Sequence, residues 1–263
     1  MTLMHIDAYS DALNRAARLD VILPAEQSGA KFRTLYLLHG MTDDQTIWQR
    51  RTSIERYADE RGLAVVMPCT ELNWYTDTHA GERWFTYIAD ELPKIARRML
   101  PRLSERREDT FVAGLSMGGY GALKCALQRP DTFCGAASLS GGLDARAVVK
   151  PETDDFGTLD PHAVDLMSYK QLWLDIFGPY ESIEGSANDL FRAAELCTNR
   201  PRVFMWCGTE DFLYTQNIRM RDHLRKLNYD LCSTESAGNH EWHCWDVQIQ
   251  HALDWLLYGR EAE

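Results

Sequence analysis

Residues 111–128 read FVAGLSMGGYGALKCALQ and contain the pattern Gly-x-Ser-x-Gly between Gly114 and Gly118. The apolar residues before the pattern predict a short strand, and Tyr120–Gln128 has the composition of a helix. A serine on so tight a turn adopts strained dihedral angles, and flanking glycines remove the Cβ atoms that would clash there. The helix N-terminus beside it also favours developing negative charge. The stretch therefore predicts a strand–turn–helix unit that presents Ser116 as a nucleophile.

The pattern alone also arises by chance in glycine-rich turns without chemistry, so a catalytic Ser116 requires a general base. On this type of turn the partners follow along the chain in the order Ser, then Asp or Glu, then His. His240 lies in the loop AGNHEW, after a predicted strand and before the closing helix. Because loops at the carboxyl ends of strands carry the sites of α/β sheets, we predict that His240 is the base. His243, at the start of the closing helix, is the rival.

The acid that orients the histidine is expected after the strand VFMW at 203–206, within the segment CGTEDF. Glu210 and Asp211 both qualify. We predict the shorter Asp211, which follows the turn residues, and keep Glu210 as the alternative. The expected role of this carboxylate is to fix the imidazole tautomer and to stabilise the imidazolium without taking its proton.

An acyl-transfer site also needs two backbone N–H donors for the oxyanion of the tetrahedral intermediate. The residue after the nucleophile supplies one of them, which here is Met117. The second is expected from the loop after the strand TLYLL at 34–38, where Met41 follows His39 and Gly40. We predict Met41 and Met117 as the donors, and we expect His39 to be a structural histidine rather than a second base.

Apolar runs and helical periodicities alternate along the chain, which predicts an α/β fold with a mostly parallel central sheet covered by helices on both faces. The first two strands are separated by a short polar turn, so we expect them to be antiparallel. The predicted strands lie at 19–23, 34–38, 63–67, 111–113, 136–139, 203–206 and 231–235, and the predicted helices at 46–61, 83–100, 120–128, 218–227 and 248–258.

Residues 143–200 interrupt this alternation with acidic residues, prolines and aromatic residues. We interpret them as a small helical cap inserted beside the site of a single domain that covers residues 1–263. Aromatic residues of the cap and of two loops are candidates to line an acyl pocket, although ordinary core packing explains each of them equally well. These candidates are Trp74, Tyr75, Trp173, Phe177 and Phe212.

The formal net charge of −11 argues against nucleic acid as a partner, because phosphate binding needs a positive surface. We expect no membrane partner either, because no segment approaches the roughly 18–20 uninterrupted apolar residues of a membrane span. Seven cysteines without CxxC spacing argue against a zinc site or a disulfide framework. Residues 1–9 lack the pattern of a secretory signal, so these features together predict a cytoplasmic enzyme without a metal.

Several further segments resemble the esterase D-type serine esterases of the α/β-hydrolase class, and most closely their bacterial tributyrin-esterase branch. The resemblance extends in consistent order from about Asp20 to Trp255, but residues 143–175 depart from any pattern of the family. The segments that carry it are LLHGM with Trp48, NWYTD (73–77), YIADELP (87–93), AGLSMGGYGAL (113–123), FGP…GSANDLF (177–191), CGTEDFLY (207–214) and GNHEWHCWD (238–246).

The resemblance implies an intracellular carboxylesterase that acts on short-chain acyl esters and needs no metal or organic cofactor. The family's triad falls on Ser116, Asp211 and His240, and its oxyanion donors fall on Met41 and Met117. Relatives include S-formylglutathione hydrolases, feruloyl and acetylxylan esterases and secreted acyltransferases. Because relatives often assemble into homo-oligomers, a second copy of the chain is a candidate partner.

Three functional hypotheses follow from these residues. The first is a serine carboxylesterase that hydrolyses small-molecule, short-chain acyl esters through an acyl-enzyme intermediate. The second is a thioesterase of the S-formylglutathione hydrolase type. The third is a binding protein on a hydrolase scaffold that has lost catalysis, which the presence of all three triad residue types disfavours.

Overall fold

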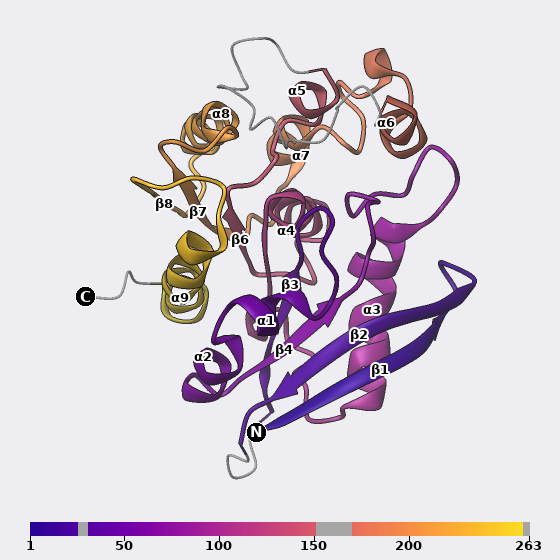
Figure 1. Ribbon diagram of the computed structural model, residues 1–263, viewed down its shortest axis with the longest axis vertical. Helices are drawn as coiled ribbons and strands as arrows, with labels where there is room; N and C mark the ends of the chain where they lie inside the picture. Colours follow the sequence, from indigo (N-terminus) through magenta and orange to yellow (C-terminus); the bar gives the residue numbers. More distant parts are fainter. Residues whose placement is uncertain (26–30, 151–169, 260–263) are drawn as a thin grey trace.

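The computed structural model describes residues 1–25, 31–150 and 170–259. Its central element is an eight-stranded sheet with the strand order β1-β2-β4-β3-β5-β6-β7-β8 (Figure 1). The strands are β1 (Thr2–Ser10), β2 (Arg15–Leu23), β3 (Arg33–Leu38), β4 (Leu63–Pro68), β5 (Thr110–Leu115), β6 (Gly135–Leu139), β7 (Arg202–Gly208) and β8 (Leu231–Ser236).

The strands from β4 across to β8 run parallel to their neighbours, whereas β2 is antiparallel to both β1 and β4. The predicted α/β fold with a mostly parallel sheet is therefore confirmed. Strands β4, β5 and β6 are buried at every residue. Such continuous burial is typical of parallel strands that are covered on both faces.

Helices cover both faces of the sheet, as predicted (Figure 1). One apolar cluster joins the sheet to α1 (Ile47–Arg51), α2 (Ile54–Glu60) and α9 (Trp242–Tyr258). The other cluster joins it to α3 (Leu92–Met99), α4 (Met117–Gln128), α7 (Leu190–Leu196) and α8 (Tyr214–Lys226). Successive residues of β3 alternate between the two clusters, because side chains of a strand point to opposite faces in turn.

The N-terminal part of the sheet differs from the expectation of two neighbouring antiparallel strands. Strands β2 and β3 do run in opposite directions, but β4 lies between them and pairs with both. The reason is that β4 is apolar and buried along its whole length, so it requires a strand at each edge. The hairpin partner of β2 is instead β1, whose alternating exposed and half-buried residues gave no strong strand pattern.

Two predicted helices are interrupted. The helix expected at 46–61 ends at Arg51 and restarts at Ile54, because the Thr52 hydroxyl bonds to the Trp48 carbonyl and also accepts the Ile54 amide. Such side-chain bonds compete with the helical ladder. The helix expected at 83–100 contains a π-helical turn, η1 (Thr86–Glu91), before α3.

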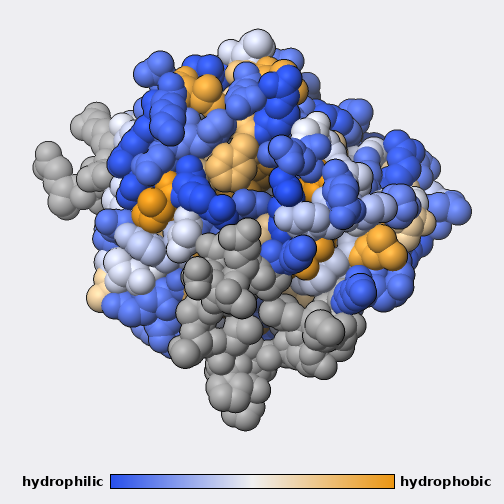
Figure 2. All heavy atoms as spheres, turned by 90° about the horizontal axis from the view of Figure 1, so that it is seen from above, coloured by the Kyte–Doolittle hydropathy of each residue, from blue (hydrophilic) through white to orange (hydrophobic). Residues whose placement is uncertain are grey.

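The cap lies between β6 and β7 and is helical where the structure describes it, while residues 151–169 lie outside the described residues. It contains α5 (Ala145–Val149), α6 (Lys170–Phe177), the short 3-10 turn η3 (Tyr180–Ser182) and α7. Seen from the cap side, the surface is mostly hydrophilic, with hydrophobic residues in separate spots (Figure 2). No helix within the described ranges has the length and apolar character to cross a membrane.

Candidate active site

Ser116 lies at the turn between β5 and α4, at the carboxyl edge of the sheet. Its backbone has φ 52° and ψ −118°, a conformation that non-glycine residues rarely adopt. The turn is held by the Ser116 amide, which donates to the Leu139 carbonyl at 2.9 Å, and by the Gly142 amide, which donates to the Ser116 carbonyl at 3.3 Å. Strained backbone of this kind persists only where the surroundings fix it, and it is concentrated at functional sites.

The first turn of α4 lies directly against the loop that follows β3. A Cβ atom on Gly118 would come within 2.5 Å of the Leu38 carbonyl oxygen and 2.6 Å of that of His39. A Cβ on Gly114 would meet the Gly118 carbonyl at 2.4 Å. Only glycine therefore permits these two segments to approach so closely, and their approach brings the 39–41 loop to Ser116.

Both predicted oxyanion donors lie on the segments that this contact joins. A Cβ on Gly40 would lie 3.8 Å from the Ser116 Cβ, which places the backbone before Met41 beside the candidate nucleophile. Met117 is the first residue of α4. Within the described part of the chain, neither the Met41 nor the Met117 amide donates a hydrogen bond. Two unpaired N–H groups are thus available next to Ser116.

His39 is a buried histidine whose ring is fixed by two hydrogen bonds. Its Nδ1–H donates to the Gly40 carbonyl at 2.7 Å, and its Nε2 accepts the Thr70 amide at 3.0 Å. Burial lowers the pKa of His39 from the ordinary 6.5 to about 4, so the ring is neutral at pH 7. With both nitrogens engaged, His39 supports the loop that carries Gly40 and Met41.

Asp211 and His240 are in direct contact. The His240 Nδ1–H donates to the Asp211 Oδ2 at 2.9 Å, and the Asp211 side chain, which is fully buried, also accepts the Leu213 amide at 2.8 Å. This bond fixes the tautomer in which Nε2 carries a lone pair. Nε2 has no hydrogen-bond partner among the described residues, and the His240 side chain is 20% exposed. The pair follows β7 and β8, at the same sheet edge as Ser116.

Two aromatic rings hold the imidazole in place. Phe212 lies 4.6 Å from the His240 ring between centroids, and Trp245 lies 4.8 Å away at an interplanar angle of 87°. The Trp245 Nε1–H donates to the Ser140 hydroxyl at 3.1 Å. Sequence reasoning missed Trp245 and Ser140, although the helical position of Trp245 five residues after His240 was a usable signal.

The two rival residues have other partners. The exposed Glu210 accepts the Gly238 amide at 2.5 Å, and this bond lowers the pKa of its carboxyl group. A Cβ on Gly208 would lie 2.0 Å from the Gly238 carbonyl oxygen, so the loops after β7 and β8 touch backbone to backbone. His243 lies on α9, where its Nδ1 is 3.0 Å from Glu241. Glu210 therefore stabilises the loop that carries His240, whereas His243 interacts with the carboxylate of Glu241.

Four of the five aromatic residues predicted for substrate binding are buried. The Trp74 ring packs edge-on against Tyr120, Trp173 and Phe177, with centroids 5.5–5.8 Å apart. The Tyr75 hydroxyl donates to the His39 carbonyl at 2.8 Å, so Tyr75 supports the loop at 39–41. Phe212, which is 36% exposed, is the fifth and lies on the His240 ring.

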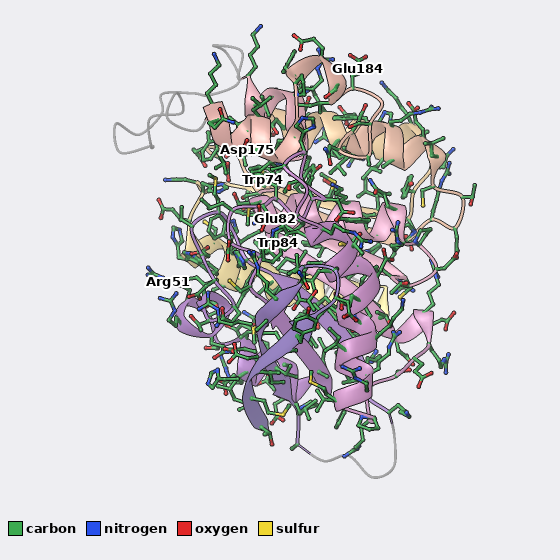
Figure 3. The ribbon with its side chains drawn as sticks, turned by 90° about the vertical axis from the view of Figure 1, so that its right-hand side faces the viewer. Arg51, Trp74, Glu82, Trp84, Asp175 and Glu184 are labelled. Carbon is green, nitrogen blue, oxygen red and sulfur yellow. The ribbon has the colours of Figure 1, made fainter. Side chains whose placement is uncertain are left out.

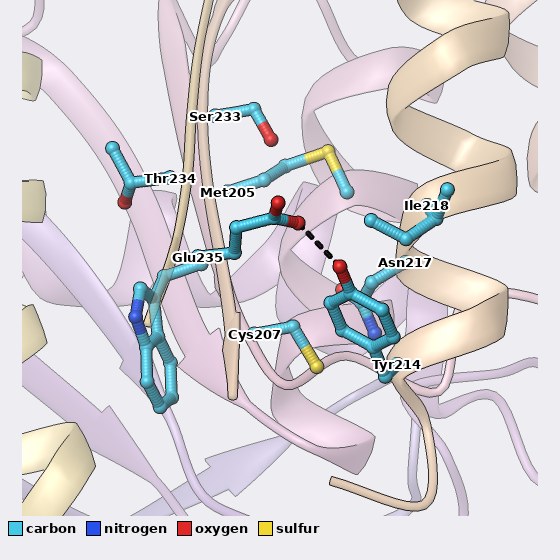
Figure 4. Close-up of a pocket in the computed structure, with 9 residues that line it drawn as sticks. Met205, Cys207, Tyr214, Asn217, Ile218, Ser233, Thr234 and Glu235 are labelled. Atoms are coloured by element: carbon cyan, nitrogen blue, oxygen red, sulfur yellow. Dashed lines mark hydrogen bonds between the residues drawn. The ribbon is translucent and has the colours of Figure 1, made fainter. Parts of the chain in front are cut away.

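A small pocket of about 10 Å³ lies between β7, β8 and α8, away from Ser116 (Figure 4). At one side of this pocket the Tyr214 hydroxyl donates to the Glu235 carboxylate at 2.6 Å. The Cys207 thiol also lines the pocket, and burial raises its pKa. Such a volume holds about one water molecule. We therefore assign it no role in substrate binding. Within the described residues, no cluster of three or more His, Cys, Asp or Glu side chains could hold a metal.

A parallel α/β sheet with a serine at a strained strand–helix turn and a His–Asp pair at the same edge defines the α/β-hydrolase class. Residues 10–256 match the model of the Esterase family, described as "Putative esterase". The chain belongs to this family and is a carboxylic ester hydrolase. The resemblance to esterase D-type serine esterases is confirmed.

Three similar proteins support this assignment. The acetyl esterase of Caldicellulosiruptor saccharolyticus is 29% identical over 270 residues, which cover 97% of this chain and 98% of that protein. The substrate-bound structure of the fluorophosphonate-binding serine hydrolase FphF of Staphylococcus aureus has a TM-score of 0.83, at 30% identity over 97% of this chain and 98% of that one. The S-formylglutathione hydrolase FrmB of Staphylococcus aureus has a TM-score of 0.80, at 30% identity over 98% of this chain and 100% of that one.

The burial of neutral His39 predicts acid sensitivity. The pKa is about 4 in the folded protein and near 6.5 in the unfolded chain, so the unfolded state binds more protons between these values. This contribution to stability is complete above pH 6.5 and is lost as the pH falls towards 4. Between pH 7 and pH 4 the free energy of unfolding of the wild type should fall by about 2–3 kcal/mol more than that of His39→Gln.

Urea unfolding followed by tryptophan fluorescence measures both proteins at each pH. The glutamine side chain in the His39→Gln variant keeps an acceptor for the Thr70 amide but does not titrate, which makes this variant the matched control. An equal decrease in both proteins would show that His39 does not carry the effect.

Proposed function

We propose that the protein is a serine carboxylesterase for short-chain acyl esters, with Ser116, His240 and Asp211 as its catalytic triad. The observation that carries the proposal is the Asp211–His240 hydrogen bond, which leaves the lone pair of Nε2 free at the sheet edge where Ser116 lies. The strained turn at Ser116 and the unpaired amides of Met41 and Met117 support it.

In the acylation step, His240 Nε2 removes the Ser116 proton as Oγ attacks the ester carbonyl carbon. The oxyanion of the tetrahedral intermediate accepts hydrogen bonds from the Met41 and Met117 amides. Asp211 stabilises the imidazolium that forms and keeps its orientation. The imidazolium then protonates the leaving alcohol, and the acyl group remains on Ser116.

In the deacylation step, His240 removes a proton from water, which attacks the acyl-enzyme carbonyl. The second tetrahedral intermediate uses the same two amides, and it collapses to release the acid and to restore the Ser116 hydroxyl. The rings of Phe212 and Trp245 fix the imidazole plane through both steps.

The preference for short acyl groups rests on the aromatic residues near Ser116. A Cβ on Gly142, whose amide bonds to the Ser116 carbonyl, would lie 2.8 Å from the Trp74 ring. Trp74, Trp173 and Phe177 are packed against one another, so the space on that side is already filled. The acetyl esterase relative acts, by its name, on acetyl esters, whose acyl group is short.

A second candidate function is thioester hydrolysis of the S-formylglutathione type, which the structural similarity to FrmB favours. The ratio of kcat/KM for S-formylglutathione to that for a simple acetyl ester separates the two functions. We also propose a cytoplasmic location, which seven buried cysteines outside any disulfide bond support, because thiols persist in a reducing compartment.

Ser116→Ala should abolish hydrolysis of p-nitrophenyl acetate and labelling by a fluorophosphonate probe, because both reactions require Oγ. Circular dichroism and urea unfolding serve as the control for an intact fold. Retained hydrolysis by the folded variant would refute the proposal. An unlabelled, inactive wild type would instead favour a binding protein on a hydrolase scaffold.

Asp211→Asn and Glu210→Gln form a matched pair that identifies the acid. The amide group introduced by Asp211→Asn can donate to the imidazole and select the wrong tautomer, so kcat should fall by about 10⁴-fold. Glu210→Gln weakens only the bond to the Gly238 amide, and we expect kcat to fall by less than about tenfold, since one exposed hydrogen bond contributes little. The opposite order of effects in steady-state kinetics would assign the acid to Glu210.

A further inference from the structure

Lys124 is a buried lysine on α4, the helix that begins at Ser116, and it has no role in the proposed mechanism. Its exposed fraction is 1%, and burial lowers its pKa to about 7. Its Nζ donates to the Thr76 hydroxyl at 2.8 Å and to the Asn188 side-chain oxygen at 2.6 Å. Both acceptors are neutral, no carboxylate among the described residues is paired with Nζ, and the charge of Asp77 offsets only part of the effect of burial on the pKa.

Stability does not explain a lysine at this position. Removal of an ammonium group from water is unfavourable, and neutral acceptors compensate for it less well than a carboxylate does. The ring faces of Phe85 and Tyr120, 5.2 and 5.6 Å from Nζ, offset part of the loss. A methionine would fill the same space without a desolvation penalty. The ammonium group therefore serves another purpose.

One acceptor belongs to the end of the cap. Tyr120, Lys124 and Gln128 lie on one face of α4, because residues four apart are neighbours on a helix. All three bond to the segment before α7: the Tyr120 hydroxyl to the Asn188 carbonyl at 3.0 Å, Lys124 to the Asn188 side chain, and Gln128 Nε2 to the Ala187 carbonyl at 2.5 Å. This face of α4 thus anchors the cap.

The other acceptor belongs to a strained loop beside the candidate nucleophile. Trp74 and Tyr75 both have φ 51°, in the left-handed region that non-glycine residues avoid. The Thr76 hydroxyl accepts from Lys124 and donates to the Trp74 carbonyl at 2.9 Å, so the ammonium group is bonded to the strained turn through one side chain. Of the two hydrogen bonds that Lys124 donates, this one leads to the Trp74 carbonyl.

The Trp74 ring packs between this loop and the cap. It packs against Trp173 and Phe177 of α6 at 5.6 and 5.8 Å, and Figure 3 shows it below Asp175 of the same helix. Its far edge reaches Gly142, whose amide bonds to the Ser116 carbonyl. The ring therefore packs against the segment that is hydrogen-bonded to the Ser116 backbone.

We propose that Lys124 is a positioning residue that sets acyl-length selectivity, because its ammonium group ties the Trp74–Tyr75 loop and the Asn188 end of the cap to the helix of Ser116. The inference rests on the proposed esterase function. If the ammonium group is removed, the Trp74 ring is held less firmly, and the enzyme discriminates less strongly against esters with longer acyl chains.

The test compares kcat/KM for p-nitrophenyl acetate and p-nitrophenyl hexanoate in the wild type and in Lys124→Met. The ratio of the two constants should shift by about tenfold towards hexanoate, which is the discrimination that about one methylene group provides in a pocket. The urea midpoint should stay unchanged or rise. A ratio within twofold of the wild type would overturn the proposal, and so would an equal loss on both esters together with a lower midpoint.

Gln128→Met is the matched control, since it removes a bond from the same helix face to the cap and leaves Thr76 untouched. Its ratio should stay within twofold of the wild type, and a shift as large as that of Lys124→Met would also overturn the proposal.

If Lys124→Met does not fold, Thr76→Val removes the loop acceptor alone and should shift the ratio in the same direction by about threefold; an unchanged ratio would contradict the inference. A wild type without esterase activity would refute the proposed function itself, which is a separate outcome.

Discussion

The contact between the first turn of α4 and the loop after β3 is the constraint on which the site depends. The backbone at Gly118 lies so close to the carbonyls of Leu38 and His39 that no Cβ atom fits between them. The same contact brings the loop that carries Gly40 and Met41 to the turn that carries Ser116 and Met117. Because this loop and this turn follow strands that are neighbours in the sheet, the parallel order of β3 and β5 is a precondition for this geometry.

A second layer of bonds supports these two loops. His39 is held between Gly40 and Thr70, and Tyr75 is bonded to the His39 carbonyl, so both residues fix the loop at 39–41. On the other side of the sheet edge, the Gly208–Gly238 contact and Glu210 bring the loop of Asp211 to that of His240. Lys124 extends this support to the cap. Within this layer, the buried ammonium group of Lys124 and the left-handed backbone of Trp74 and Tyr75 are unfavourable for stability.

The sequence was sufficient for features that depend on local pattern and chain order. The Gly-x-Ser-x-Gly turn, the buried parallel strands and the order of serine, aspartate and histidine are all visible in short segments, and the structure contains the fold that they predict. The Asp211–His240 contact agrees with the expected pairing, because both residues follow adjacent strands. Strand β1 was missed because it lies at the sheet edge and its residues alternate without a strong apolar face.

Contacts between distant segments were beyond the reach of sequence reasoning. The bonds from Lys124 to Thr76 and Asn188 join residues 48 and 64 positions apart, and the bond from Trp245 to Ser140 spans 105 positions. No pattern within one segment encodes such partners. The burial of Trp74 and Tyr75 likewise depends on the cap packing over them, and the cap was the segment with the least recognisable pattern.

In the proposed mechanism, ester hydrolysis proceeds through an acyl group on Ser116. Rapid quenching of the enzyme during turnover of p-nitrophenyl acetate, followed by peptide mass spectrometry, tests it directly. We expect a burst of nitrophenol and one acetyl group on the peptide that contains Ser116. Turnover with no acylated peptide, or with the acetyl group on a cysteine or another serine, would contradict it.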